Sequence, residues 1–111
     1  MLLTAKLRTH LRRNAATSER GEVNHRPVVK FFLPGTSAIW LFTELAADDD
    51  TLFGVCDLGH GTPELGYASL AEIQSLRGPN RLLVERDRSF QSTKPLSEYA
   101  AEARRHGRIV A

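Results

Sequence analysis

Side chains that could do chemistry are concentrated between Cys56 and Tyr67. This stretch reads CDLGHGTPELGY and combines a thiol, two carboxylates, an imidazole and a phenol with three glycines and one proline. A cysteine near a histidine can form a nucleophile and its base, and two carboxylates can act as a general acid and base. The same residue types are also typical of a tight polar turn. Two interpretations therefore stand at the outset, an active site and a structural turn.

The residues around each candidate group favour the turn. Cys56 and Asp57 are adjacent in an expected strand, so their side chains point to opposite faces, and no HxxxH or HExxH spacing occurs. We expect Cys56 to be a small buried hydrophobe, Asp57 to accept backbone hydrogen bonds within the turn, and Glu64 to pair with an arginine. We therefore expect no metal, no cofactor and no catalytic residue. A small hydrolase or transferase centred on Asp57, His60 and Glu64 is the weakest alternative.

The elements that position this stretch alternate between helical and strand patterns. Apolar spacing and capping residues predict helices at 4–15, 69–78 and 97–106, and β-branched or aromatic runs predict strands at 27–33, 37–45, 51–59, 64–70 and 81–90. Strand 37–45 is apolar on both faces, which predicts a central strand with Leu41 and Leu45 on the same face. Residues 16–26 are predicted to be a loop. The result is a single α+β domain over residues 1–111, with a mainly antiparallel sheet of four or five strands and about three packed helices.

Charge is segregated along the chain although the net charge is only +2. Residues 1–30 hold seven Lys or Arg and two Asp or Glu, and residues 77–111 hold eight and four. Residues 31–76 hold seven Asp or Glu and no Lys or Arg. This pattern suggests one acidic surface and one or two basic surfaces. The plainer alternative is that the blocks pair with one another when the chain folds.

Each charged surface suggests a different partner. For a protein partner, the candidate contact residues are those of the acidic segment and the polar stretch: Glu44, Asp48, Asp49, Asp50, Asp57, His60, Glu64 and Tyr67. For nucleic acid, the candidates are the cations of the first and last helices: Lys6, Arg8, Arg12, Arg13, Arg104, Arg105 and Arg108. These cations would form a single basic face if the two helices lie side by side.

The single cysteine and the lack of a long apolar run bear on the compartment. One cysteine excludes an internal disulfide framework, and no stretch approaches the roughly 20 apolar residues of a membrane span. We therefore expect a cytoplasmic protein with no membrane contact. The oligomeric state stays open.

Three segments together resemble a known bacterial family. They read PVVKFFLPGTSAIWLFTEL at 27–45, CDLGHGTPELGYASL at 56–70 and LLVERDRSFQSTKPLSEYAAEARRHGRI at 82–109. In order and spacing the chain is similar, from Leu3 to Ile109, to the family designated domain of unknown function 2958. The resemblance implies an accessory protein of plasmids, integrative elements or phage-like regions. It assigns no catalytic residue.

These observations lead to a non-enzymatic module that binds a bacterial protein or nucleoprotein complex. A counter-defence inhibitor, directed against a restriction or CRISPR complex, is the specific form that the mobile-element context suggests. The alternative from a different class is a DNA- or RNA-binding accessory protein that uses the basic terminal helices.

Overall fold

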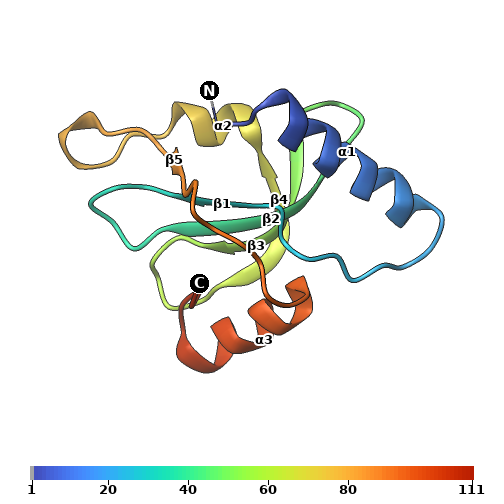
Figure 1. The fold of residues 1–111 in the computed structure, drawn as a ribbon. Coiled ribbons are helices and arrows are strands. Elements are labelled where there is room, and N and C mark those ends of the chain that lie inside the picture. The colour runs from blue at the N-terminus through green and yellow to red at the C-terminus, as the bar shows by residue number, and fades with distance from the viewer. Residues whose placement is uncertain (1) are drawn as a thin grey trace.

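The computed structural model describes residues 2–111. Five strands form one sheet in the order β4-β3-β2-β1-β5, and every strand pair is antiparallel (Figure 1). The elements in chain order are α1 (Ala5–Glu19), β1 (Val29–Phe32), β2 (Ile39–Leu45), β3 (Thr51–Asp57), β4 (Glu64–Ser69), α2 (Leu70–Ser75), the 3₁₀ turn Pro79–Arg81, β5 (Glu85–Arg86) and α3 (Leu96–His106). The predicted α+β class, the antiparallel sheet and the three helices are confirmed.

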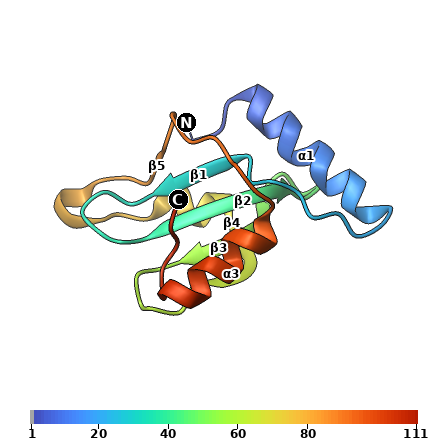
Figure 2. The same cartoon turned by 60° about the horizontal axis from the view of Figure 1, so that its bottom comes forward.

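The sheet separates two hydrophobic cores. Helices α1 and α2 lie on one side of it and α3 lies on the other (Figures 1 and 2). The first core packs α1 and α2 against one face of the sheet. Its members include Leu11 of α1, Phe42 of β2 and Ile73 of α2. The second packs α3 against Leu41 and Val55. The strand β2 is therefore covered on both faces, as its apolar pattern predicts.

Helices α1 and α3 do not lie side by side, so the condition for a single basic face is not met. Their packing onto opposite faces follows from their apolar stripes, since Leu3 and Leu11 belong to the first core whereas Tyr99 and Ala103 belong to the second. The cations of the two helices consequently face opposite sides of the molecule.

A β-bulge in β2 places Leu45 on the opposite face of the sheet from Leu41, which corrects the prediction that they share a face. The register with β3 shifts between Phe42 and Glu44, and an extra residue in one strand reverses the facing of the side chains beyond it. Leu45 therefore packs into the first core with Phe42 instead of joining Leu41.

Element ends depart from the sequence expectation in several places. Helix α1 continues to Glu19, four residues beyond the predicted end, and the predicted strand 81–90 is reduced to the two residues of β5. The reduction follows from the 3₁₀ turn, where Asn80 and Arg81 adopt positive φ of 57° and 61°, a conformation that a strand does not contain. The short helix α2 ends at Ser75, before Gly78, and Ser69 caps its first turn as predicted.

No helix within residues 2–111 has both the length and the apolarity needed to cross a membrane.

Candidate functional site

The turn between β3 and β4 is built around a buried carboxylate. Asp57 is only 1% exposed. Its Oδ1 accepts a hydrogen bond from the Gly59 N–H at 2.8 Å, and its Oδ2 accepts one from the Ile109 N–H at 3.0 Å. Gly59 and Gly61 adopt φ of +85° and +83°, which glycine does without strain. The predicted hydrogen bonding of Asp57 within the turn is confirmed, and it extends to the C-terminal segment.

The strand register separates Asp57 from the other candidate catalytic groups. Cys56 lies opposite Glu64 in the β3–β4 ladder, so their side chains share the face of the first core, and the next residue, Asp57, turns to the face of α3. Cys56, His60 and Glu64 line one shallow depression. No hydrogen bond joins their side chains within the described chain. Asp57 therefore offers no surface to a substrate that would contact His60 and Glu64.

The environment of Cys56 opposes a nucleophilic role. Burial raises the pKa of its thiol to about 11, because desolvation disfavours the thiolate. At neutral pH the thiol is protonated, and the thiolate is the nucleophilic form. Across residues 2–111 no group of three or more His, Cys, Asp or Glu side chains is placed to hold a metal ion.

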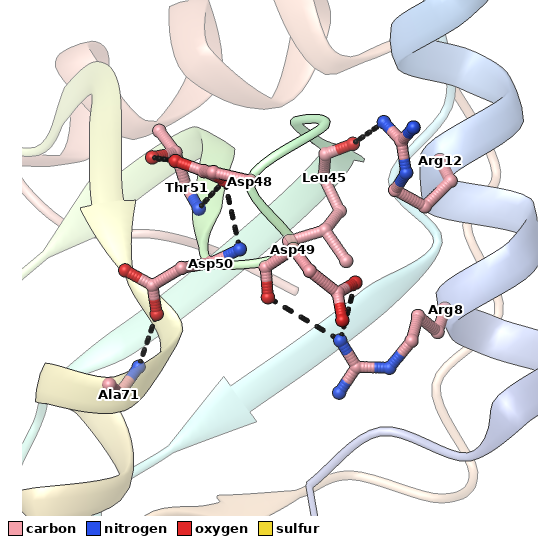
Figure 3. A network of polar contacts seen from close by, with 8 residues as sticks. All are labelled: Arg8, Arg12, Leu45, Asp48, Asp49, Asp50, Thr51 and Ala71. Carbon is pink, nitrogen blue, oxygen red and sulfur yellow. Dashed lines mark hydrogen bonds and ion pairs between the residues drawn. The ribbon is translucent and has the colours of Figure 1, made fainter.

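The acidic loop between β2 and β3 is committed largely to internal contacts (Figure 3). The carboxylate of Asp48 accepts hydrogen bonds from the Asp50 N–H, the Thr51 N–H and the Thr51 hydroxyl at 2.9, 2.8 and 2.6 Å. The two bonds from Thr51 are the main cause that lowers the pKa of Asp48 to about 2. Asp48 therefore closes the hairpin loop as an ionised acceptor.

The neighbouring aspartates tie this loop to two helices (Figure 3). Asp50 accepts from the Ala71 N–H and the Ser69 hydroxyl at the start of α2, at 2.8 and 2.7 Å. Asp49 forms an ion pair with Arg8 of α1 at 2.8 Å. Part of the acidic segment thus pairs with part of the basic first helix. A second cation of that helix, Arg12, donates to the Leu45 carbonyl at 3.2 Å.

The outer edge of β4 carries the most exposed aromatic side chain of the sheet. Tyr67 is 75% exposed, and its ring lies against Phe53 with centroids 5.0 Å apart. The register places Glu44 opposite Phe53 and Phe53 opposite Tyr67, so these three residues form a row across the sheet on the side of α3. Tyr67 is therefore a supported, outward-facing ring, and it has no hydrogen bond within residues 2–111.

Further apolar and acidic side chains surround Tyr67. Leu65 is 40% exposed and shares its face, and Val23 of the loop after α1 is 44% exposed. The Glu44 carboxylate accepts a hydrogen bond from the Ser18 hydroxyl at 3.1 Å. We call this surface the β4 edge, and it comprises Glu22, Val23, Glu44, Phe53, Glu64, Leu65 and Tyr67.

Part of the β4 edge could be predicted from the sequence. Glu44, Glu64 and Tyr67 were candidates, whereas Glu22, Val23, Phe53 and Leu65 were not. The alternation of Leu65 and Tyr67 was visible in the sequence, but an alternating pair marks a buried face as readily as an open one. The predicted pairing of Glu64 with an arginine does not occur among the described residues.

The other candidate cations lie on two separate surfaces. On α1, the exposed Lys6 and Arg13 line one depression on the outer side of the helix together with His10. On α3, Arg104, Arg105 and the following Arg108 are exposed near the C-terminal end of the helix, which is favourable beside the negative end of the helix dipole.

Comparison with known proteins shows the family and nothing beyond it. Searches of curated proteins and of solved structures found no match to this chain. The profile of the family described as protein of unknown function (DUF2958) matches residues 2–110. Because this match spans nearly the whole chain, the protein belongs to the DUF2958 family.

Proposed function

We propose that this chain is a non-enzymatic protein-binding module whose contact surface is the β4 edge. The observation that carries the proposal is Tyr67, which is 75% exposed while its ring is held against Phe53. Tyrosine is enriched among the residues that dominate binding energy at protein interfaces. A ring that is already fixed in place loses little conformational entropy when a partner covers it. Leu65 and Val23 extend the apolar area around it.

The charge of the β4 edge supports a basic partner. Strands β2, β3 and β4 come from residues 31–76, which contain no Lys or Arg. Glu22 and Glu44 lie beside the apolar centre on the side of α3, and Glu64 lies at the same edge on the opposite face. Complementary charge at the rim of an interface guides association and selects among partners. Proteins that bind nucleic acid carry basic surfaces, which would complement the carboxylates of the β4 edge. Within the proposed mobile-element context, we therefore favour a nucleic-acid-binding protein of a host defence system as the partner.

The polar stretch supports binding over catalysis. Both carboxylate oxygens of Asp57 accept hydrogen bonds from backbone N–H groups, one from Gly59 and one from Ile109. The Cys56 thiol is protonated at neutral pH, because its pKa is raised to about 11. These two facts weaken the hydrolase hypothesis, since its carboxylate is enclosed and the neighbouring thiol is inactive.

Removing the Tyr67 ring tests the proposal. We expect nuclease-treated bacterial lysate to yield a discrete protein bound to the tagged wild-type chain, and Tyr67→Ala to capture at least about tenfold less of it, because an anchoring aromatic ring contributes about 2 kcal/mol or more. Quantitative mass spectrometry measures the capture. Leu83→Ala is the matched control, since Leu83 is 49% exposed and lies just before β5, at the opposite edge of the sheet.

Circular dichroism on heating checks that Tyr67→Ala is folded, which we expect because the side chain is mostly in solvent. Equal capture by the wild type and Tyr67→Ala would contradict the β4 edge as the contact surface. Capture that disappears on nuclease treatment would contradict direct protein binding.

Nucleic-acid binding through α1 is the second candidate. Lys6, His10 and Arg13 lie together on the outer side of that helix, where a phosphate backbone could contact them. Arg8 and Arg12 contribute less, because they already contact Asp49 and the Leu45 carbonyl. The separation of α1 from α3 removes the larger combined surface that this function would use.

A further inference from the structure

Two hydrogen bonds at the start of β3 determine which of its residues face β4. The Ala46 N–H donates to the Thr51 carbonyl at 2.8 Å, so the backbone of Thr51 faces β2. The Leu70 N–H donates to the Asp50 carbonyl at 2.9 Å, so Asp50 faces the side of β4. Backbone groups of successive strand residues point to opposite sides. The N–H and C=O groups of Gly54, three residues after Thr51, therefore face β4.

The same alternation determines which groups of β4 face outward. Gly54 lies opposite Gly66, so the backbone of Gly66 points inward to β3. The N–H and C=O groups of its neighbours, Leu65 and Tyr67, point away from the sheet. Within residues 2–111 these outward groups take part in no backbone hydrogen bond. The strand β4 thus presents four unpaired backbone groups beside its two exposed apolar side chains.

The two edges of the sheet differ in how well they are protected. The edge strand β5 has two residues, Glu85 and Arg86, and both are charged. Short length and charge are the usual means of preventing strand pairing. The edge strand β4 has six residues in continuous register with β3, and it contains no lysine, no bulge and no internal proline. Of the two edges, β4 is therefore the one open to a further strand.

We propose that β4 binds an extended segment of a partner protein as a sixth strand, in which apolar residues alternate with lysine or arginine. This inference rests on the proposed function and specifies how the β4 edge is used. Backbone hydrogen bonds to Leu65 and Tyr67 hold the segment, as in other cases of strand addition. Its apolar side chains contact Leu65 and Tyr67 on the side of α3. Its basic side chains lie on the opposite face, next to Glu64.

Charge selects a basic partner segment over a second copy of this chain. Glu22 and Glu44 flank the edge on the side of α3 and Glu64 on the opposite face, and Arg20 is the one Lys or Arg among the described residues that line the three depressions beside it. Two copies paired through β4 would bring two acidic edges together, and neither strand supplies a Lys or Arg to pair with their carboxylates. A basic segment gains attraction from Glu64, which lies on the face that its basic side chains would occupy.

A library of linear random peptides displayed on phage, selected against the wild-type chain, tests this inference. We expect the enriched peptides to alternate apolar with basic residues. Synthetic versions are then measured by fluorescence polarisation against Leu65→Pro and Leu65→Ala. Proline removes an outward N–H that the fold does not use, whereas alanine removes the leucine side chain and keeps that N–H. We expect Leu65→Pro to bind at least about tenfold more weakly than Leu65→Ala, because an unmade backbone hydrogen bond leaves its partner unpaired.

Three results would overturn strand addition by a basic segment. They are equal affinity of Leu65→Pro and Leu65→Ala, enrichment of acidic or non-alternating peptides, and no enrichment. A wild-type dimer in sedimentation velocity that dissociates in Leu65→Pro but not in Leu65→Ala would assign the edge to a second copy instead. If Leu65→Pro does not fold, a backbone ester at residue 65, made by ligation, removes the same N–H.

The variant Tyr67→Ala separates this inference from the proposed function. If it loses the peptide while Leu65→Pro and Leu65→Ala bind equally, the β4 edge is a contact surface without strand addition. If Tyr67→Ala binds the peptide as tightly as the wild type, the proposed function fails as well.

Discussion

Asp48 and Asp57 are carboxylates that both hold a turn, but they do so in different surroundings. Asp57 is buried and accepts one N–H from its own turn and one from Ile109, 52 residues later. Asp48 is exposed and accepts three hydrogen bonds, all from the two residues that follow Asp49. The contribution of Asp48 to stability can therefore be measured by titration without disturbing a hydrophobic core.

We expect Asp48→Asn to remove part of the acid sensitivity of the fold. The pKa of Asp48 is lowered from 3.8 to about 2 by its hydrogen bonds from Thr51. A folded-state pKa below the unfolded value gives stability that is present above about pH 4 and is lost as the pH falls to about 2. The free energy of unfolding should thus decrease less over this range in Asp48→Asn than in the wild type. Urea unfolding at a series of pH values measures it.

Asp49→Asn is the control for this comparison, because within residues 2–111 the Asp49 side chain forms an ion pair with Arg8 and no hydrogen bond within its own loop. The lowered pKa values of Asp87 and Glu102 are common to all three proteins and cancel in the differences. The same pH slope in the wild type and Asp48→Asn would contradict the assignment.

At the scale of elements, the sheet depends on a close approach between β2 and β3. A Cβ atom added to Gly54 would lie 1.8 Å from the Leu41 carbonyl oxygen, whereas one added to Gly66 would have no atom within 4 Å. The two glycines are register partners in neighbouring strands. Both are glycines within strands, but only Gly66 has room for a side chain.

We expect Gly54→Ala to lower the free energy of unfolding by more than about 3 kcal/mol, because backbone atoms cannot move aside as a flexible side chain can. Gly66→Ala should change it by less than about 1 kcal/mol, as for most substitutions at open positions. Urea unfolding of the two variants compares them directly. Similar losses in both would show that the approach of β2 to Gly54 does not restrict this position.

At the scale of the whole molecule, the sheet places the two basic helices on opposite sides (Figures 1 and 2). Lys6 and Arg13 lie on α1, and Arg104 and Arg105 lie on α3. A straight duplex that contacts one pair therefore has the thickness of the sheet between it and the other pair. Binding of nucleic acid, where it occurs, uses one helix.

If α1 binds DNA, we expect the double variant Lys6→Ala/Arg13→Ala to flatten the dependence of the affinity on salt by about two phosphate contacts. Arg104→Ala/Arg105→Ala should leave the slope unchanged and serves as the control of equal charge. Fluorescence anisotropy with a random-sequence duplex over a range of salt concentrations measures the slope. An equal effect of both double variants would contradict the use of a single helix.

Several features of the candidate site could be predicted because they involve residues that are close in the chain. Ser69 caps α2 and Gly107 ends α3 with φ of 69°, as their residue types indicate. The loop at 46–50 lies between β2 and β3, where the predicted strands 37–45 and 51–59 leave it. Asp57 accepts a hydrogen bond from the N–H of Gly59, two residues later in the chain, which is a contact typical of an aspartate that begins a turn. The bulge between Phe42 and Glu44 and the positive φ at Arg81 left no such local signal.

The element types, the segregated charge and the polar turn follow from the sequence alone, because periodicity, capping and turn chemistry act over a few residues. The tertiary structure makes β4 an edge strand with Leu65 and Tyr67 exposed. It also places α1 and α3 on opposite faces, and Asp49 next to Arg8. These outcomes depend on the order in which strands pair and on contacts between distant segments. An alternating strand has the same sequence pattern in either place, and whether it borders another strand or solvent is settled only when the whole sheet forms.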